Sequence, residues 1–250
     1  MNGSDRVGRR ALLAGLAGLP LLSPLAAAAA GVAESAPESA PENASEGSAR
    51  PPVDLALVLA VDASASISRD ALDFQLRGHA AAFRDPRVAA AVARGGHGRI
   101  AVTLVQFAGP DTLTALVPWR LVAGAADCAA MADAIDAVPG IAMGGSTALG
   151  SAIVAAVALI ERAPWTAARR KIDLVSNGFN NAGIDPLSAR AHAAAAGITV
   201  NALAILDEFD WLEAYYAENV IAGEGAFVRT AGGADDFAAA FLSKLMAEIA

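Results

Sequence analysis

Three short oxygen-bearing side chains follow a run of apolar residues near position 60 of the sequence. In the stretch LVLAVDASASIS, the residues Asp62, Ser64 and Ser66 alternate with alanine directly after that run. A carboxylate and two hydroxyls are hard oxygen ligands, which suit Mg²⁺, Mn²⁺ or Ca²⁺ better than zinc. The spacing predicts a cation site at the end of a buried strand. The alternative is a helix cap that binds no ligand, because Asp and Ser also accept hydrogen bonds from free helix N–H groups.

Two later polar clusters favour the cation site. Thr147 lies in GGSTALG, which opens a predicted helix, and Asn177 lies in SNGFNN, which follows a predicted strand. In an open α/β sheet, ligands bind outside the carboxyl ends of the strands, so the three clusters are expected to meet there. The predicted metal site consists of Asp62, Ser64, Ser66, Thr147 and Asn177.

The elements that must position these residues alternate along residues 53–250. Apolar, β-branched segments predict strands at 54–62, 99–108, 112–122, 171–176, 198–206 and 226–230. Pro118 places the third strand at an edge, because proline cannot donate a hydrogen bond to a neighbouring strand. We predict an α/β fold with a doubly wound, Rossmann-like sheet of about six strands. The expected strand order is 3-2-1-4-5-6, with one antiparallel edge strand and helices on both faces.

The segments between the strands carry apolar residues three and four positions apart, as helices that pack on a sheet do. These sets are Leu72, Leu76, His79 and Phe83, then Leu149, Ile153, Val157 and Ile160, and finally Phe237, Phe241, Leu245 and Ile249. A further helix is expected at 209–222. Its residues Trp211, Tyr215 and Tyr216 form either a contact surface or part of the core.

The three loops together resemble the metal-ion-dependent adhesion site of the von Willebrand factor A domain, written D-x-S-x-S, then Thr, then Asp. Asp62, Ser64 and Ser66 match the first part, and Thr147 matches the second in its setting. The stretch KIDLVSNGFNNAG is similar to one uncharacterised family of secreted bacterial proteins in that superfamily. The resemblance implies a bound divalent cation, Mg²⁺ in first place and Mn²⁺ or Ca²⁺ otherwise. Through it the domain would capture a carboxylate of a protein partner.

One position departs from that pattern. The superfamily usually has an Asp on the third loop, where this chain has Asn177. An amide oxygen can coordinate a cation but brings no negative charge. The predicted ligand set therefore contains a single carboxylate, that of Asp62. A structural periplasmic protein with a degenerate, metal-free site is the alternative function.

The sequence lacks the motifs of common enzyme classes. It has no glycine-rich dinucleotide loop after the first strand, no G-x-S-x-G elbow and no histidine placed as a base. A metal-dependent hydrolase that uses Asp62 would need a second acid or base, so we expect a binding protein without catalytic residues. The lone Cys128 is expected to be buried on a helix, and Asp54 and Asp173 to face each other as structural carboxylates.

The first 52 residues differ in composition from the rest. Residues 1–30 combine arginines with an apolar stretch and a run of alanines, which predicts a removable signal peptide, with RR followed by ALL resembling the twin-arginine type. Residues 31–52 are rich in Ser, Pro, Glu and Ala and predict a disordered tether to the domain at 53–250. The mature protein would be periplasmic or secreted, without a permanent membrane span. A net charge of −8 argues against nucleic acid as a partner.

Overall fold

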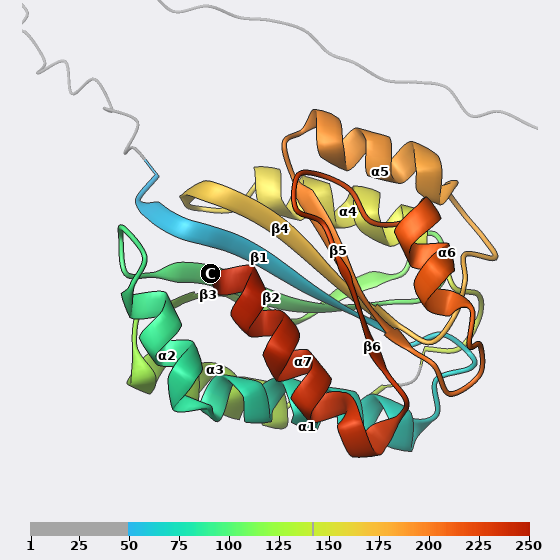
Figure 1. The fold of residues 1–250 in the computed structure, drawn as a ribbon, viewed down its shortest axis with the longest axis horizontal. Helices are drawn as coiled ribbons and strands as arrows, with labels where there is room; N and C mark the ends of the chain where they lie inside the picture. The colour runs from blue at the N-terminus through green and yellow to red at the C-terminus, as the bar shows by residue number, and fades with distance from the viewer. Residues whose placement is uncertain (1–49, 142) are drawn as a thin grey trace, which may run out of the picture. The chain divides into compact units, whose positions relative to one another are not determined.

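A six-stranded sheet organises residues 50–141 and 143–250, which are the residues that the computed structural model describes. The strand order is β3-β2-β1-β4-β5-β6, and only the β2–β3 pair is antiparallel (Figure 1). The predicted order and the antiparallel edge strand are confirmed. The predicted signal peptide, and the predicted tether up to residue 49, lie outside the described residues.

The elements alternate along the chain as predicted. The strands are β1 Pro52–Asp62, β2 Ile100–Phe107, β3 Leu113–Val122, β4 Thr166–Ser176, β5 Thr199–Ile205 and β6 Val228–Ala231. The helices are α1 Arg69–Arg84, α2 Pro86–Ala93, α3 Ala125–Asp136, α4 Leu149–Glu161, α5 Pro186–Ala195, α6 Leu212–Asn219 and α7 Ala234–Ile249. In the part of the chain that the structure describes, no helix is long and apolar enough to cross a bilayer.

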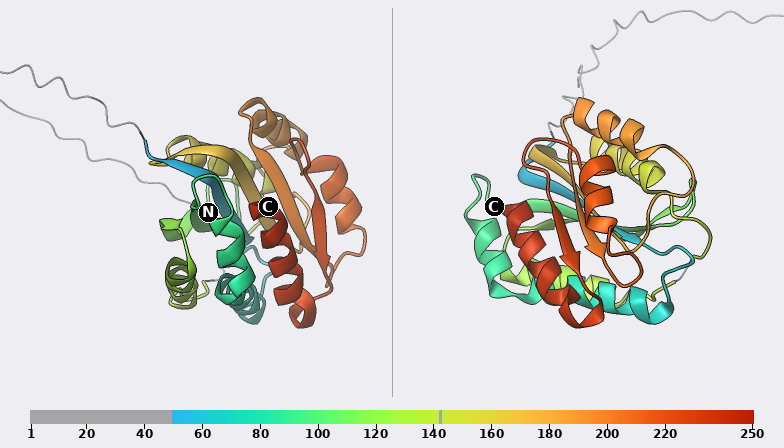
Figure 2. Two further views of the ribbon diagram at one scale, coloured as in Figure 1. Left: turned by 60° about the vertical axis from the view of Figure 1, so that its left-hand side comes forward. Right: turned by 45° about the vertical axis from the view of Figure 1, so that its right-hand side comes forward.

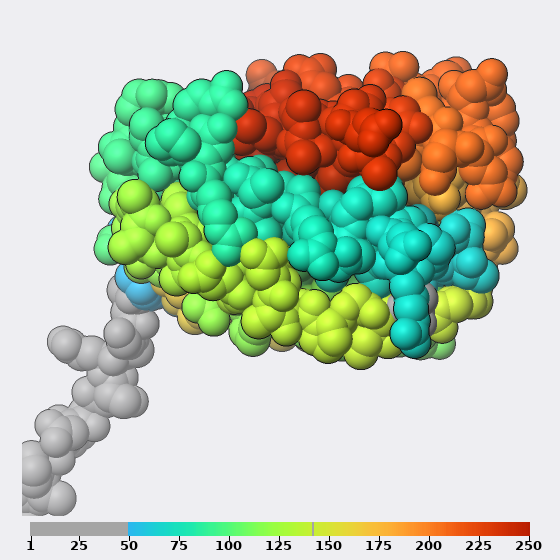
Figure 3. Space-filling model, turned by 90° about the horizontal axis from the view of Figure 1, so that it is seen from below, coloured from blue at the N-terminus to red at the C-terminus, as the bar shows by residue number. Residues whose placement is uncertain are grey.

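Helices cover both faces of the sheet. Helices α1, α2, α3 and α7 form one layer, which is continuous when the molecule is seen from below (Figure 3), and α4, α5 and α6 lie on the opposite face (Figure 2). Successive β1 residues alternate between these layers, with Leu57 and Leu59 on the α7 side and Val58 and Ala60 on the α4 side. This period of two explains why β1 is apolar throughout, since both of its faces are buried.

Strand β4 begins at Thr166, earlier than the predicted start at Lys171. The basic run Arg169-Arg170-Lys171 belongs to the strand, and each side chain donates a hydrogen bond to a carbonyl at the C-terminal end of a helix. Cations at that end of a helix satisfy free carbonyl groups and are favoured by the helix dipole. The bonds run from Arg169 to Ile249 (2.7 Å), from Arg170 to Ala196 (2.6 Å) and from Lys171 to Glu248 (2.9 Å).

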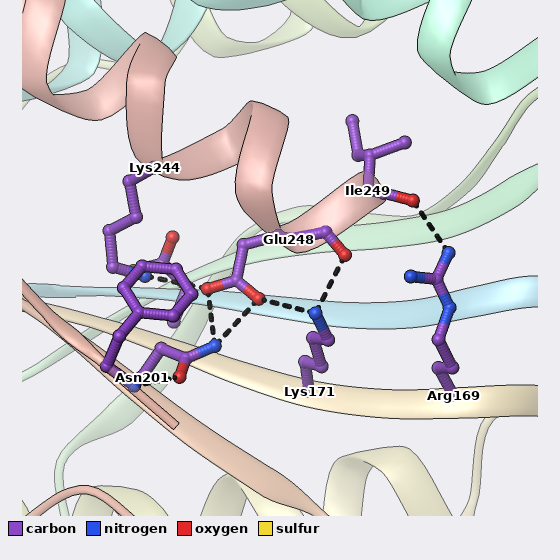
Figure 4. A network of polar contacts seen from close by, with 8 residues as sticks. Arg169, Lys171, Asn201, Lys244, Glu248 and Ile249 are labelled. Carbon is purple, nitrogen blue, oxygen red and sulfur yellow. Dashed lines mark hydrogen bonds and ion pairs between the residues drawn. The ribbon is translucent and has the colours of Figure 1, made fainter. Parts of the chain in front are cut away.

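A buried charge network fixes α7 to the sheet (Figure 4). The fully buried Lys244 ammonium lies 2.6 Å from Asp173 on β4 and 2.8 Å from Glu248, one turn further along α7. Lys171 lies 3.3 Å from Glu248, and Asn201 donates to the same carboxylate at 2.8 Å. Two ammonium groups therefore balance two buried carboxylates, which makes the network neutral as a whole.

This network corrects the prediction that Asp54 and Asp173 face each other. Asp173 pairs with Lys244 instead. Asp54 accepts hydrogen bonds from the backbone N–H groups of His97 (2.8 Å) and Arg99 (3.2 Å), in the turn before β2. Both carboxylates are structural, as expected, but each has partners of its own, because the sequence does not reveal the long-range contacts of α7.

The buried His79 on α1 should make the stability of the fold sensitive to acid. It is fully buried, its ring packs against Phe241 with centroids 3.7 Å apart, and its Nδ1 lies 2.7 Å from the Gln75 carbonyl oxygen. Burial lowers its pKa from 6.5 to about 4; the Gln75 carbonyl opposes this shift and the Lys244 charge adds to it. The unfolded chain then binds this proton between about pH 6.5 and 4 while the native protein does not, so stability falls as the pH falls through that window.

We expect His79→Leu to reduce the difference in unfolding free energy between pH 7 and pH 4.5 by about 2 kcal/mol. Urea denaturation at both pH values measures this difference. The control is His192→Gln, since His192 is exposed on α5. An unchanged pH dependence in His79→Leu would contradict the assignment of this acid sensitivity to His79.

Candidate metal centre

The strand register brings two of the three predicted loops together. Val61 of β1 pairs with Val175 of β4, so Asp62 and Ser176 lie side by side where these central strands end. The loop before α4 joins them: the N–H groups of Met143 and Gly144 donate to the Ala63 carbonyl at 2.9 and 3.2 Å. Figure 1 shows the three loops at one end of the sheet. That end consists of the carboxyl ends of the parallel strands, where ligands bind in this class of fold.

Among the described residues, Asp62 is a buried carboxylate without a cationic side chain beside it. It is fully buried, and its two oxygens accept hydrogen bonds from the Ser64 N–H at 2.8 Å and the Ser176 hydroxyl at 2.6 Å. Burial raises the pKa of the Asp62 carboxyl, while the bonds from Ser176 and Ser64 oppose that rise. No ion pair within residues 50–141 and 143–250 involves Asp62, whereas the equally buried Asp173 has Lys244.

The remaining predicted residues form two contacting pairs around Asp62. The Thr147 hydroxyl donates to the Ser64 hydroxyl at 2.9 Å, and the Ser66 hydroxyl donates to the Asn177 amide oxygen at 3.0 Å. Ser64, Thr147 and Asn177 are buried, while Ser66 is exposed. The structure thus gathers all five predicted side chains at one place, with Asp62 at the bottom and Ser66 at the surface.

Helix α1 is capped by a residue that is not one of the predicted metal ligands. The Ser68 hydroxyl accepts the Ala71 N–H at 3.0 Å, and Ser68 is the N-cap of α1. Helix α4 likewise has no side-chain cap from Thr147, whose hydroxyl points to Ser64 instead. The hydroxyls of Ser64, Ser66 and Thr147 are therefore not explained by helix capping.

Residues that the sequence analysis did not assign hold the site in shape. Besides Ser176 on Asp62, the side chain of Asn181 accepts the Thr147 N–H at 2.8 Å, and Asn180 accepts the Gly150 N–H at 3.1 Å. All three lie in SNGFNN, and the high density of short polar residues in that stretch is the feature of the sequence that could have indicated them. These bonds tie the third loop to the second, so Thr147 is positioned from both sides.

A pocket of about 180 Å³ opens over the pairs. Ser66, Thr147 and Asn181 line it on the polar side, and Phe179 and Phe209 on the apolar side. Gly178 permits this opening, because a Cβ there would lie 3.3 Å from the Thr147 hydroxyl. Glu208 is the acidic residue of the lining, and nothing in the sequence analysis marked it. The pocket therefore lies beside Ser66 and Thr147, one residue from each of the two contacting pairs.

The donor set is rich in oxygen and poor in charge. Within the described residues, no three His, Cys, Asp or Glu side chains gather as a metal-binding group. A cation near Asp62 would draw its other ligands from the hydroxyls and the Asn177 amide. Such a set fits a hard cation that keeps part of its water shell.

A search against protein families identifies the chain. The family described as "Protein of unknown function (DUF1194)" matches residues 52–250. The chain belongs to this family. No curated protein sequence matches the DUF1194 chain.

Solved structures resemble this DUF1194 member over most of its length. Proximal thread matrix protein 1 from the mussel byssus, solved with a zinc-occupied MIDAS motif, has 17% identity and a TM-score of 0.59 over 80% of this chain and 48% of that chain. The pilus adhesin SpaC from Lactobacillus rhamnosus GG has 14% identity and a TM-score of 0.56, over 79% and 30%. A von Willebrand factor type A protein from Catenulispora acidiphila has 15% identity and a TM-score of 0.54, over 79% and 43%.

The likeness establishes the fold. Identities of 14–17% carry no residue roles, and the DUF1194 chain spans less than half the length of each of these structures. The described domain has the von Willebrand factor A fold, which confirms the predicted resemblance at the level of architecture.

Proposed function

We propose that this protein is an exported binding module that holds a divalent cation, Mg²⁺ or one of similar chemistry. Its ligand set would be Asp62, Ser64, Ser66, Thr147 and Asn177, and the cation would capture a carboxylate of a protein partner. The carrying observation is the fully buried Asp62 carboxylate, which accepts hydrogen bonds from the Ser64 N–H and the Ser176 hydroxyl and forms no ion pair with any described residue. A buried carboxylate is strongly disfavoured unless a positive charge or several hydrogen bonds balance it, and a cation from solvent would supply that charge.

The charge of the site favours an anionic partner. With Asp62 as the one carboxylate among the proposed ligands, a bound divalent ion keeps a net charge of about +1. A partner's carboxylate would complete the coordination shell and cancel that charge. The open pocket between Ser66 and Thr147 gives such a group access from solvent. Two of the similar structures support this proposal, since one is a pilus adhesin and the other was solved with a zinc-occupied MIDAS motif.

Export and a non-catalytic role belong to the same proposal. The arginine-containing apolar segment at residues 1–30 would direct export, and residues 31–52 would tether the domain at 53–250. Around Asp62, the site consists of hydroxyls and amides, and no histidine is among the pocket lining. A metal-free structural protein is the second candidate. The Ser66–Asn177 contact favours it, because the third loop contributes a neutral amide there and no negative charge.

The proposed capture is tested with two labelled peptides that differ only in one Glu-to-Gln replacement. We expect the Glu peptide to bind in Mg²⁺, at least about tenfold more tightly than the Gln peptide, because only a carboxylate can enter the shell as an anion. Fluorescence anisotropy with and without EDTA gives both affinities. Equal binding of the two peptides, or binding of the Glu peptide that EDTA does not affect, would contradict carboxylate capture through a cation.

A further inference from the structure

An aromatic surface adjoins the pocket. It consists of Phe179 from the loop after β4, Phe209 and Trp211 from the loop before α6, and Tyr215 on α6. Their ring centroids lie 5.6 Å apart for Phe179 and Phe209, 5.1 Å for Phe209 and Trp211, and 6.0 Å for Trp211 and Tyr215. Phe179 and Phe209 also line the pocket, so the aromatic surface is continuous with the candidate metal centre.

The aromatic surface remains accessible to solvent. Trp211 is 46% exposed and Phe179 is 37% exposed. Tyr216, next to Tyr215 in the chain, is instead buried, and its hydroxyl donates to the Gly178 carbonyl at 2.7 Å. The aromatic residues of this segment therefore divide between core and surface. Exposed aromatic rings that pack on one another are typical of protein-binding surfaces, where Trp and Tyr contribute most of the affinity.

Acidic residues surround these rings. Asp207, Glu208, Asp210 and Glu213 alternate with the aromatic residues in DEFDWLEAYY, and the chain has no Lys or Arg between Arg190 and Arg229. All four acidic residues are exposed, and no ion pair in the described part of the chain involves them. A negative potential over exposed aromatic faces attracts cations and repels acidic ligands.

We propose that the aromatic surface binds an arginine-containing segment of a partner polypeptide. A guanidinium group stacks on the face of Trp or Tyr and forms paired hydrogen bonds to carboxylates, so arginine uses both features of this surface. Trp211 would provide the stacking face, and Glu208, Asp210 and Glu213 the acceptors. This docking requires no bound cation. If the proposed function is correct, the same partner presents a carboxylate to the pocket beside its arginine.

The experiment uses two labelled probes, the peptides Gly-Ser-Arg-Tyr-Arg-Gly-Ser and Gly-Ser-Gln-Tyr-Gln-Gly-Ser, in EDTA. We expect the arginine peptide to bind at least about tenfold more tightly than the glutamine peptide, and Trp211→Ala to remove most of that difference. Asp210→Asn/Glu213→Gln should weaken the arginine peptide and reduce the salt dependence of its affinity. Because EDTA is present, failure of the cation site would not affect the result.

Matched controls lie away from the surface. Trp165→Ala removes a tryptophan that directly precedes β4 and packs on Trp119. Asp133→Asn/Asp136→Asn removes two negative charges from α3, as many as Asp210→Asn/Glu213→Gln removes from the aromatic surface. Both should leave the affinity for the arginine peptide unchanged. Equal affinity for the two peptides, no binding below about 1 mM, or equal effects of Trp211→Ala and Trp165→Ala would overturn the proposal.

Discussion

Replacing Lys244 with methionine is expected to lower the free energy of unfolding by about 3–5 kcal/mol. The change leaves Asp173 and Glu248 buried without the ammonium that lies 2.6 and 2.8 Å from them. Removing one partner of a buried ion pair is far more harmful than removing an exposed one, because the remaining charge has neither water nor a counter-ion. Urea denaturation followed by circular dichroism measures the loss.

The pH dependence of this variant has a defined sign. Burial already raises the pKa of the Asp173 carboxyl, and the charge of Lys244 opposes that rise. Without Lys244 the native state binds a proton at Asp173 that the unfolded chain has released, so stability falls as the pH rises above about 4. The loss should thus be larger at pH 8 than at pH 5.

Two further variants separate the buried network from general effects of charge. Arg77→Met removes an exposed partner of Asp73 on α1 and should cost less than about 1 kcal/mol. Adding Asp173→Asn to Lys244→Met should recover part of the loss. A Lys244→Met protein as stable as Arg77→Met would show that Lys244 does not hold α7 in place.

Replacing Asp62 with asparagine is expected to abolish stabilisation by Mg²⁺ and to weaken its binding more than about 100-fold. The amide keeps the shape of the side chain: its oxygen can accept the Ser64 N–H, and its NH₂ group can donate to the Ser176 hydroxyl. It removes the charge, which is the one carboxylate in the proposed ligand set. The metal-free variant should fold normally, since burial disfavours the charged form of Asp62.

Thermal unfolding at increasing Mg²⁺ concentration tests this directly. Wild-type melting temperature should rise with Mg²⁺, because a ligand that binds only the native state stabilises it. Asp62→Asn should show no rise, and Asp70→Asn, an exposed charge change on α1, should behave as wild type. Equal rises in wild type and Asp62→Asn would place any cation elsewhere on the protein.

The sequence predicted which polar side chains lie together more completely than it predicted the contacts that hold them there. Asp62, Ser64 and Ser66 end an apolar run, and a run of that length fixes both the strand and the end at which they emerge. The partners of Lys244 could not be predicted from local sequence, because a single lysine on a helix usually lies in solvent. Only long-range contacts bury it against Asp173. The start of β4 was predicted too late for a related reason. Three basic residues in succession suggest an exposed loop, and the sequence does not show that their side chains donate hydrogen bonds to carbonyls at helix C-termini.

The sequence did not decide whether the aromatic residues of 209–222 belong to the core or to the surface. The structure places some of them in each. Trp211 and Tyr216 are both aromatic residues of one segment, yet only Tyr216 is buried. The contribution of Phe179 comes from a loop that is distant in sequence. A stripe of aromatic residues does not specify its own neighbours, so their exposure depends on how α6 sits on β5 and β6.

Calorimetric titration of Mn²⁺ into the metal-free domain, for wild type and Asn177→Asp, tests the central claim most directly. We predict measurable binding by wild type, and binding at least about tenfold tighter by Asn177→Asp, because a second carboxylate joins the ligand set. The amide oxygen of Asn177 already faces the Ser66 hydroxyl at 3.0 Å, so the new carboxylate would occupy the same place. If neither protein binds Mn²⁺, then Asp62 and its hydroxyl partners form a structural hydrogen-bond cluster, and the protein does not act through a bound cation.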